Sequence, residues 1–113
     1  MYATTTGLRN IAIGSGSATS GHPAMRYSTT GSYNTAIGNG ALALNTTSSY
    51  NTALGYEAGY GGTSASQFNT DIGGQAGFTG GNYSTRVGFA AGYLSTGEYN
   101  TFVGCRNSAN YGC

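Results

Sequence analysis

The chain has 113 residues, enough for one domain, and its composition differs from that of an ordinary enzyme. Glycine occurs 21 times, and charged residues make up only 6% of the chain, against about 25% in a typical domain. The net charge of +1 excludes the strong positive field that attracts nucleic acids, and no apolar run approaches the roughly 18 residues of a membrane-spanning helix. We therefore expect no nucleic-acid partner and no membrane insertion.

A short motif recurs along the chain, with glycine as its last residue. Four copies read Asn-Thr-x-aliphatic-Gly, and two variants read Asn-Ile-Ala-Ile-Gly and Ser-Thr-Arg-Val-Gly. Successive motif glycines are 24, 17, 18, 15 and 16 residues apart. The copies occupy residues 10–14, 34–38, 51–55, 69–73, 84–88 and 100–104. Self-similarity at a short period over most of a chain is typical of solenoids and fibre repeats.

The period is too short for helical-pair repeats, which need about 33 residues or more. It fits one coil of a β-solenoid, with two short strands and two bends, because Thr, Ile, Val and Tyr favour strands while Gly, Asn and Ser favour bends. We therefore predict an all-β, short-period parallel β-solenoid (a β-roll or β-helix) of about six coils. It forms one domain over residues 1–113, with an irregular insertion at about residues 15–32.

Stacked copies would place equivalent residues in columns about 4.8 Å apart. Asn side chains in such a column can bond backbone groups at the bends, and the motif glycine can adopt the positive φ of a corner. We interpret these columns as scaffold. Their members are Asn34, Asn51, Asn69 and Asn100; Thr35, Thr52, Thr70, Thr85 and Thr101; Ile37, Leu54, Ile72, Val87 and Val103; and Gly38, Gly55, Gly73, Gly88 and Gly104.

The variable position between Thr and the aliphatic residue indicates which way the strand side chains point. It holds Ala in three copies and Asp71, Arg86 and Phe102 in the others. Because such a mixture of sizes and charges suits solvent, we place this position outward. Side chains alternate along a strand, so the Thr and aliphatic residues are expected to point inward.

Aromatic residues precede five of the motif copies and form a further column. If the copies stack in register, Tyr33, Tyr50, Tyr83 and Tyr99 lie above one another. An exposed row of tyrosines would suit stacking against sugar rings, whereas a buried row would pack an interior or an interface. The insertion has two interpretations as well. It is a surface loop that interrupts the solenoid, or a protruding contact for a neighbouring subunit or a receptor.

Catalytic and metal-binding patterns are absent from the sequence. His22 is the only histidine, no Cys/His cluster has zinc spacing, and the carboxylates Glu57, Asp71 and Glu98 fall in different coils. The Gly38-Asn39-Gly40 run resembles a dinucleotide-binding turn, but the next copy follows too soon for the helical crossover that such a site needs. We therefore expect no enzyme activity, no metal and no cofactor.

Two kinds of covalent modification are suggested by short patterns. Asn45-Thr46-Thr47 and Asn82-Tyr83-Ser84 match the N-glycosylation sequence, which also arises by chance in chains rich in Asn, Ser and Thr. Cys105 and Cys113 could form a disulfide within or between chains, or stay free.

The energetics of a thin coil predict association with other copies. Each coil offers one large aliphatic side chain, which contributes roughly 1.5–3 kcal/mol when buried. Ordering the backbone costs about 1–2 kcal/mol for each residue. Burying the apolar faces of several chains against one another would offset this cost, so we expect a homotrimer or an end-stacked polymer.

The chain resembles a known class of repeat at Ile11-Ala12-Ile13-Gly14 and at the later Asn-Thr-Ala-Ile-Gly copies, over about residues 8–109. It is similar to the head repeats of trimeric autotransporter adhesins and to the Asn-Thr-Ala-Ile-Gly repeats of phage tail-fibre proteins. The resemblance to adhesin heads implies a left-handed parallel β-roll in which three chains share a core. The coils here are longer than those of adhesin heads and carry more aromatic residues.

These observations favour a structural fibre protein that self-assembles and presents a surface for attachment. Such a protein would be extracellular, as a cell-surface filament, an adhesin head (a glycoprotein if a sequon is used) or a tail-fibre segment of a virion. Its partners would be copies of itself and, on the attachment surface, glycans or a host receptor. The alternative is an ice- or glycan-binding solenoid. An ice-binding face needs outward rows of Thr, whereas the expected orientation places Thr inward.

Overall fold

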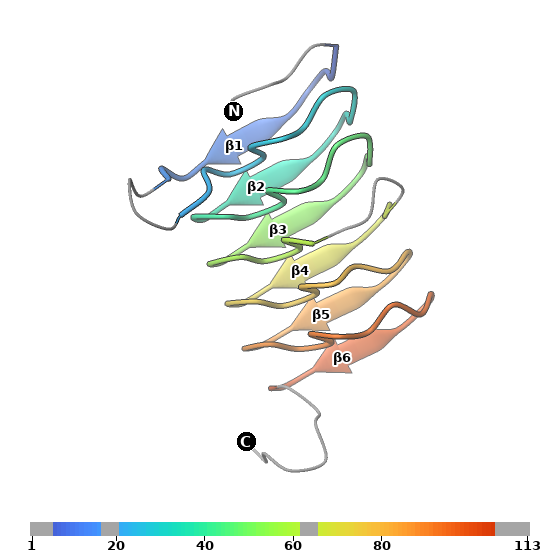
Figure 1. Ribbon diagram of the computed structural model, residues 1–113. Coiled ribbons are helices and arrows are strands. Elements are labelled where there is room, and N and C mark those ends of the chain that lie inside the picture. Colours follow the sequence, from blue (N-terminus) through green and yellow to red (C-terminus); the bar gives the residue numbers. More distant parts are fainter. Residues whose placement is uncertain (1–5, 17–20, 62–65, 106–113) are drawn as a thin grey trace.

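The computed structural model describes residues 6–16, 21–61 and 66–105, and it confirms the predicted all-β solenoid. Each motif copy contributes one short strand, and the chain leaves the sheet and returns before the next strand (Figure 1). The strands are β1 (Ile11–Ile13), β2 (Thr35–Ile37), β3 (Thr52–Leu54), β4 (Thr70–Ile72), β5 (Thr85–Val87) and β6 (Thr101–Val103). They form one parallel sheet in the order β1 to β6.

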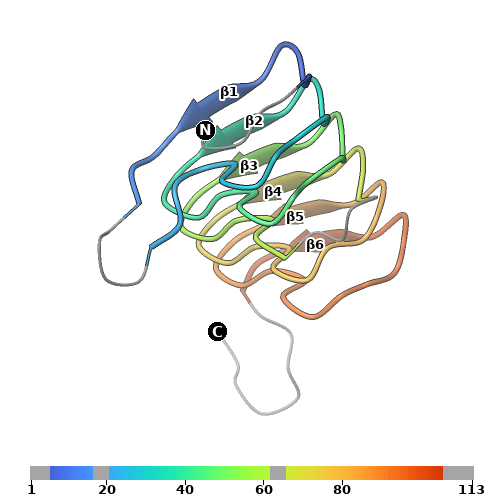
Figure 2. The ribbon, with the colours of Figure 1, turned by 45° about the horizontal axis from the view of Figure 1, so that its top comes forward.

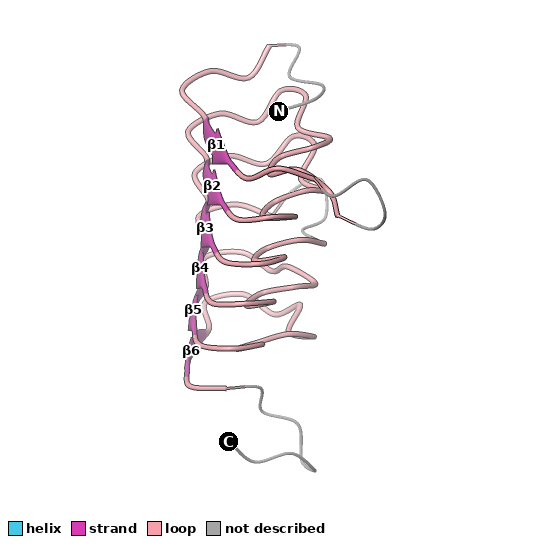
Figure 3. Ribbon diagram, turned by 90° about the vertical axis from the view of Figure 1, so that its left-hand side faces the viewer, coloured by secondary structure: helices cyan, strands magenta, loops and turns pink. Residues whose placement is uncertain are grey.

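The register of the sheet aligns equivalent residues of neighbouring copies, as the motif alignment predicts. Thr35 lies opposite Thr52, and Ile37 lies opposite Leu54. All the strands lie along one side of the molecule, and the return segments stack on the other side (Figure 2 and Figure 3). Within the described residues, no helix is long and apolar enough to cross a membrane.

The return segments form a second hydrogen-bonded wall, but they consist of turns and not of the second strand that we expected. The backbone N–H of Leu42 donates to the carbonyl of Ala58 at 3.0 Å, and that of Gly59 donates to Ala76 at 2.8 Å. The turns arise because residues such as Leu42 and Glu57 adopt positive φ values, of 50° and 53°, which a strand does not contain. The buried alanines of this wall are Ala24, Ala41, Ala43, Ala58, Ala76, Ala90 and Ala91.

The predicted orientation of the strand side chains is wrong. The variable position points inward, because Ala53, Asp71 and Arg86 are almost completely buried. The Thr and aliphatic positions point outward, and Leu54 is 45% exposed while Val103 is 78% exposed. The two walls are close together, and the interior between them admits mainly alanine and glycine. The larger aliphatic residues therefore occupy the outer face of the sheet.

The size of the side chain at the variable position varies inversely with the size of the residue opposite it on the return wall. In the early copies, Met25 and Leu42 fill the interior together with alanines of the strands. In the later copies, glycine stands on the return wall instead. A Cβ added to Gly77 would lie 2.4 Å from Oδ1 of Asp71 and 2.6 Å from Nη1 of Arg86. Glycine on one wall thus makes room for the large polar side chains of the other.

The irregular insertion is shorter than we predicted, because its second half belongs to the return wall. The N–H of Met25 donates to the carbonyl of Ala41 at 2.9 Å, and Met25 is completely buried. The insertion is therefore not a surface loop from Ala24 onward. Residues 17–20 lie outside the described residues.

The motif glycines form the corner at which each strand ends. Their φ values are positive, as expected, with 134° at Gly38 and 119° at Gly104. Successive corners stack closely, so a Cβ on Gly38 would lie 2.3 Å from the carbonyl oxygen of Gly55. At Gly104, a Cβ would meet no atom of the described residues within 4 Å. A substitution at Gly104 would therefore cause backbone strain alone, whereas one at Gly38 would cause both strain and steric overlap.

We predict that Gly104→Ala lowers the free energy of unfolding by about 1–3 kcal/mol, because alanine is strained at this φ. Gly38→Ala should lower it by a further 1–3 kcal/mol or so, because its methyl group also overlaps the next corner. Urea unfolding followed by circular dichroism measures both. Equal losses in the two variants would show that the corners are not packed as described.

Candidate functional site

The outer face of the sheet repeats the same kinds of side chain from copy to copy. It consists of two adjacent columns, which we call the Thr/aliphatic face: one of Thr, with Ile11 in the first copy, and one of aliphatic residues. Its members are Ile11, Ile13, Thr35, Ile37, Thr52, Leu54, Thr70, Ile72, Thr85, Val87, Thr101 and Val103. None of them is charged. Seen from the side, the strands that carry the face lie in a nearly straight row (Figure 3).

Aliphatic side chains on this face are open to solvent in the single chain. Ile13, Leu54 and Val103 are exposed, and Ile37 is half-buried. Soluble monomers rarely expose a continuous apolar row, and rows of this kind mark interaction surfaces. The predicted strands therefore carry exposed aliphatic side chains on their outer face.

The Asn column fixes the start of each strand. The backbone N–H of Asn51 donates to Oδ1 of Asn34 at 3.0 Å, and the N–H of Asn69 donates to Oδ1 of Asn51 at 3.0 Å. The Nδ2 group of Asn51 also donates to the carbonyl of Ser66 at 2.9 Å. In the fifth copy, the N–H of Ser84 donates to Oδ1 of Asn69 at 3.1 Å. These amides pair buried backbone groups at the bends, as the sequence indicated.

The aromatic residues before the motif form one continuous stack. Its members are Tyr33, Tyr50, Phe68, Tyr83 and Tyr99. Successive ring centroids are 4.9–5.1 Å apart, and the ring planes lie within 6° of each other. The rings cover one another's faces and leave their edges at the surface. Since a sugar ring stacks on an aromatic face, the interior of this column does not offer the sugar-binding platform considered above.

Asp71 and Arg86 form a buried ion pair, which sequence reasoning missed by placing both residues in solvent. Nη1 of Arg86 donates to Oδ1 of Asp71 at 2.7 Å, and both side chains are almost completely buried. Nε and Nη2 of Arg86 have no hydrogen-bond partner among the described residues. Burial raises the pKa of Asp71 to about 6, although the neighbouring guanidinium acts to lower it. The sequence did contain a signal for this pair, because residues of opposite charge occupy the variable position of two adjacent copies.

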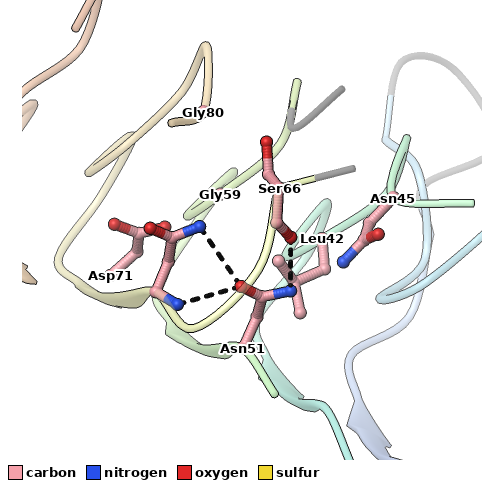
Figure 4. Close-up of a pocket in the computed structure, with 8 residues that line it drawn as sticks. Leu42, Asn45, Asn51, Gly59, Ser66, Asp71 and Gly80 are labelled. Carbon is pink, nitrogen blue, oxygen red and sulfur yellow. Dashed lines mark hydrogen bonds between the residues drawn. The ribbon is translucent and has the colours of Figure 1, made fainter. Parts of the chain in front are cut away.

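A small cavity of about 10 Å³ lies beside the Asn column. Asn51, Ser66 and Asp71 are among the residues that line it, and Figure 4 shows the bonds of Asn51 at its wall. This volume suits a single water molecule. The cavity is therefore too small to be a ligand site.

The other polar residues singled out from the sequence are not brought together. The carboxylate of Glu57 accepts from Nε2 of Gln75 at 2.8 Å, while that of Glu98 accepts from Nδ2 of Asn82 at 2.8 Å. Nη1 of Arg26 lies 2.6 Å from Nδ1 of the single histidine, His22. Among the described residues, no group of three or more His, Cys, Asp or Glu side chains could hold a metal ion.

The proposed modification sites differ in accessibility. Asn45 is buried, and its Oδ1 accepts from the N–H of Ser48 at 3.1 Å, so it is not an accessible glycosylation acceptor in the folded chain. Asn82 is half-buried, and both ends of its amide are hydrogen-bonded. Cys105 is disulfide-bonded, while Cys113 lies outside the described residues.

The raised pKa of Asp71 predicts how stability changes with pH. The folded chain holds the Asp71 proton up to about pH 6, whereas the unfolded chain loses it near pH 4. Stability contributed by this group is therefore present below about pH 4 and decreases as the pH rises to about 6, by on the order of 3 kcal/mol. Urea unfolding between pH 4 and 7 measures the slope.

The matched control for this slope is the double substitution Asp71→Ala with Arg86→Met. It removes the titrating group without leaving a lone buried charge, and replacing a buried ion pair by apolar residues often preserves folding. The slope between pH 4 and 6 should flatten in this variant. If the slope stays the same, another group causes it.

The Thr/aliphatic face, the Asn column and the aromatic column are all features of the repeat, and each extends along most of the solenoid. Comparison of the chain with family models, curated proteins and solved structures finds no match. The function proposed below therefore rests on the geometry of these repeated features.

Proposed function

We propose that the protein is a structural subunit that assembles side by side through the Thr/aliphatic face into an extracellular or virion-borne fibre. The observation that carries this proposal is the row of aliphatic side chains left open on that face. Leu54 is exposed on it, as are Ile13 and Val103. A second and a third copy that turn the same face toward a common axis would bury the row.

The composition of the interior supports this proposal. The buried apolar residues within the coil are mainly alanines, and Met25 and Leu42 are the only larger ones among the described residues. Alanine contributes little apolar area, whereas each aliphatic side chain contributes roughly 1.5–3 kcal/mol when buried. The chain thus carries most of its aliphatic residues on the outside, where only a partner can cover them.

A closed ring of three chains fits the shape of this face. The face is two side chains wide and six strands long, so three such faces can surround an axis along the solenoid. Closed cyclic symmetry is the common arrangement of homo-oligomers. The resemblance to trimeric adhesin heads favours the same number of chains.

The role that suits such an assembly is attachment. A rigid repeat scaffold holds its loops outward, where a host receptor or surface glycan could bind them. The disulfide at Cys105 suits an oxidising compartment, as expected for an extracellular protein. No residue is assigned a catalytic role in this proposal.

We predict that Leu54→Glu abolishes the side-by-side association of chains, because it places a charge at the centre of the buried row. Sedimentation equilibrium over a dilution series measures the mass. The matched control is Leu94→Glu, which changes an exposed leucine of the return wall and should leave the assembly intact. A wild-type chain that is monomeric at every concentration would contradict the proposal.

Ice binding is the second candidate, because the structure reverses the reason for setting it aside. Thr52, Thr70 and Thr85 stand in register on the outside of the sheet, beside the aliphatic column. A flat outward row of Thr is what an ice-binding face needs. The same face cannot be covered by other copies and also lie against ice, so the two candidates exclude each other.

Thermal hysteresis measured on the wild-type chain and on Thr70→Tyr separates the two candidates. A monomer that binds ice through this face should show hysteresis, and the bulky tyrosine should abolish it. Thr96→Tyr is the control, because Thr96 is exposed but lies on the return wall. We expect no hysteresis in the assembled wild-type protein. Hysteresis that Thr70→Tyr abolishes would favour ice binding instead.

A further inference from the structure

The two ends of the solenoid have complementary surfaces that no described residue covers. β1 and β6 are the edge strands of the sheet, and each has a single neighbouring strand. Neither strand contains a charged residue or a proline, which are the common means of blocking an edge. The flanking Asn10 and Asn100 belong to the same column of the motif.

The aromatic stack ends differently at its two termini. Arg9 occupies the aromatic position of the first copy, since its φ of 57° matches the 59° of Tyr33 and the 58° of Tyr99. Its guanidinium lies over the Tyr33 ring, 5.2 Å from the centroid, and an Nη1 group of Arg9 bonds the Tyr33 hydroxyl. At the other end, Tyr99 is 75% exposed and stacks on Tyr83 by one face. In the described part of the chain, nothing lies over its other face.

The hydrogen bonds that join neighbouring copies could continue from one chain to the next. Within the chain, the N–H of Thr85 donates to the carbonyl of Asn100 at 2.9 Å, and the N–H of Asn34 donates to Oδ1 of Asn10 at 2.9 Å. In the same pattern, the N–H of Thr101 would donate to the carbonyl of Asn10 in the next chain. Oδ1 of Asn100 would accept from the N–H of that same Asn10.

The interior of the solenoid is also incomplete at both ends. The variable position is fully buried in the four middle copies, whereas Ala12 and Phe102, at the two ends, are only half-buried. Stacking β6 of one chain on β1 of the next would place Phe102 beside Ala12 and complete the burial of both. The ends therefore match in ring stacking, in hydrogen bonding and in apolar surface.

We propose that copies of this chain stack head to tail, with the guanidinium of Arg9 of one copy seated on the open face of Tyr99 of the preceding copy. The partner is a second copy of this chain, and the contact is cation–π stacking continued by a parallel β-ladder. Because this contact between two different surfaces stacks each copy on the next along the solenoid axis, it generates an open filament and not a closed ring. The inference rests on the proposed self-assembly but uses a different surface from the Thr/aliphatic face.

The test uses the full chain and a charge swap. Tyr99→Arg should weaken end-to-end association about tenfold or more, because two guanidinium groups then meet at the junction. The double variant Arg9→Tyr with Tyr99→Arg restores one cation and one ring at every junction, and it should restore filaments. Arg stacked on Tyr already occurs at Arg9 and Tyr33, so Tyr99→Arg is compatible with the fold. Circular dichroism checks that each variant is folded.

Filament length in electron micrographs and scattering intensity at low salt provide the readout. The proposal is overturned if folded wild-type particles never exceed one chain in length, if Tyr99→Arg leaves the length unchanged, or if the double variant stays as short as Tyr99→Arg. Leu54→Glu distinguishes this interface from the lateral one. Thin filaments of single chains in Leu54→Glu would mean that both interfaces exist. Thick wild-type filaments that Leu54→Glu leaves unchanged would overturn the lateral assembly alone.

Discussion

Hydrogen bonding between equivalent positions of successive copies is the interaction on which the rest of this structure depends. The side-chain amide of Asn51 accepts from the next copy, and its Nδ2 group pairs a carbonyl at the bend, so each coil is placed by the coil before it. This bonding requires the coils to approach closely at the corners, where only glycine fits, as at Gly38. Once the coils are in register, the aromatic stack and the Thr/aliphatic face follow, since every equivalent residue lies above its counterpart.

The close approach of the two walls determines what the interior can contain. Most copies place alanine there, and the two polar residues Asp71 and Arg86 fit because Gly77 leaves space opposite them. Such an interior buries little apolar area, so the single chain lacks the core that a domain of this size usually has. The aliphatic residues that would form one stand on the outer face, where Leu54 is exposed. Because the interior is rich in alanine and the aliphatic residues lie outside, we propose that the protein functions by assembling with other copies.

The recurrence of the motif was sufficient to predict the solenoid, the strand positions, the register and the positive φ at the motif glycines. It predicted the aromatic column for the same reason, because a period shared by Tyr33 and Tyr50 places one ring above the other. It did not predict which face points inward. A position that holds Ala, Asp71 and Arg86 looks solvent-exposed, and the compensating glycine lies on another segment. The buried Met25 was also missed, because the insertion before it hides its alignment with Leu42.

A reconstruction of the assembled wild-type particle by electron cryomicroscopy tests the central claim most directly. We predict that the Thr/aliphatic face, including Thr52 and Leu54, lies at the contact between chains. Ala53 and the Arg86–Asp71 pair should stay inside each coil. Particles with the mass of one chain, or a map in which Leu54 faces solvent, would contradict the account.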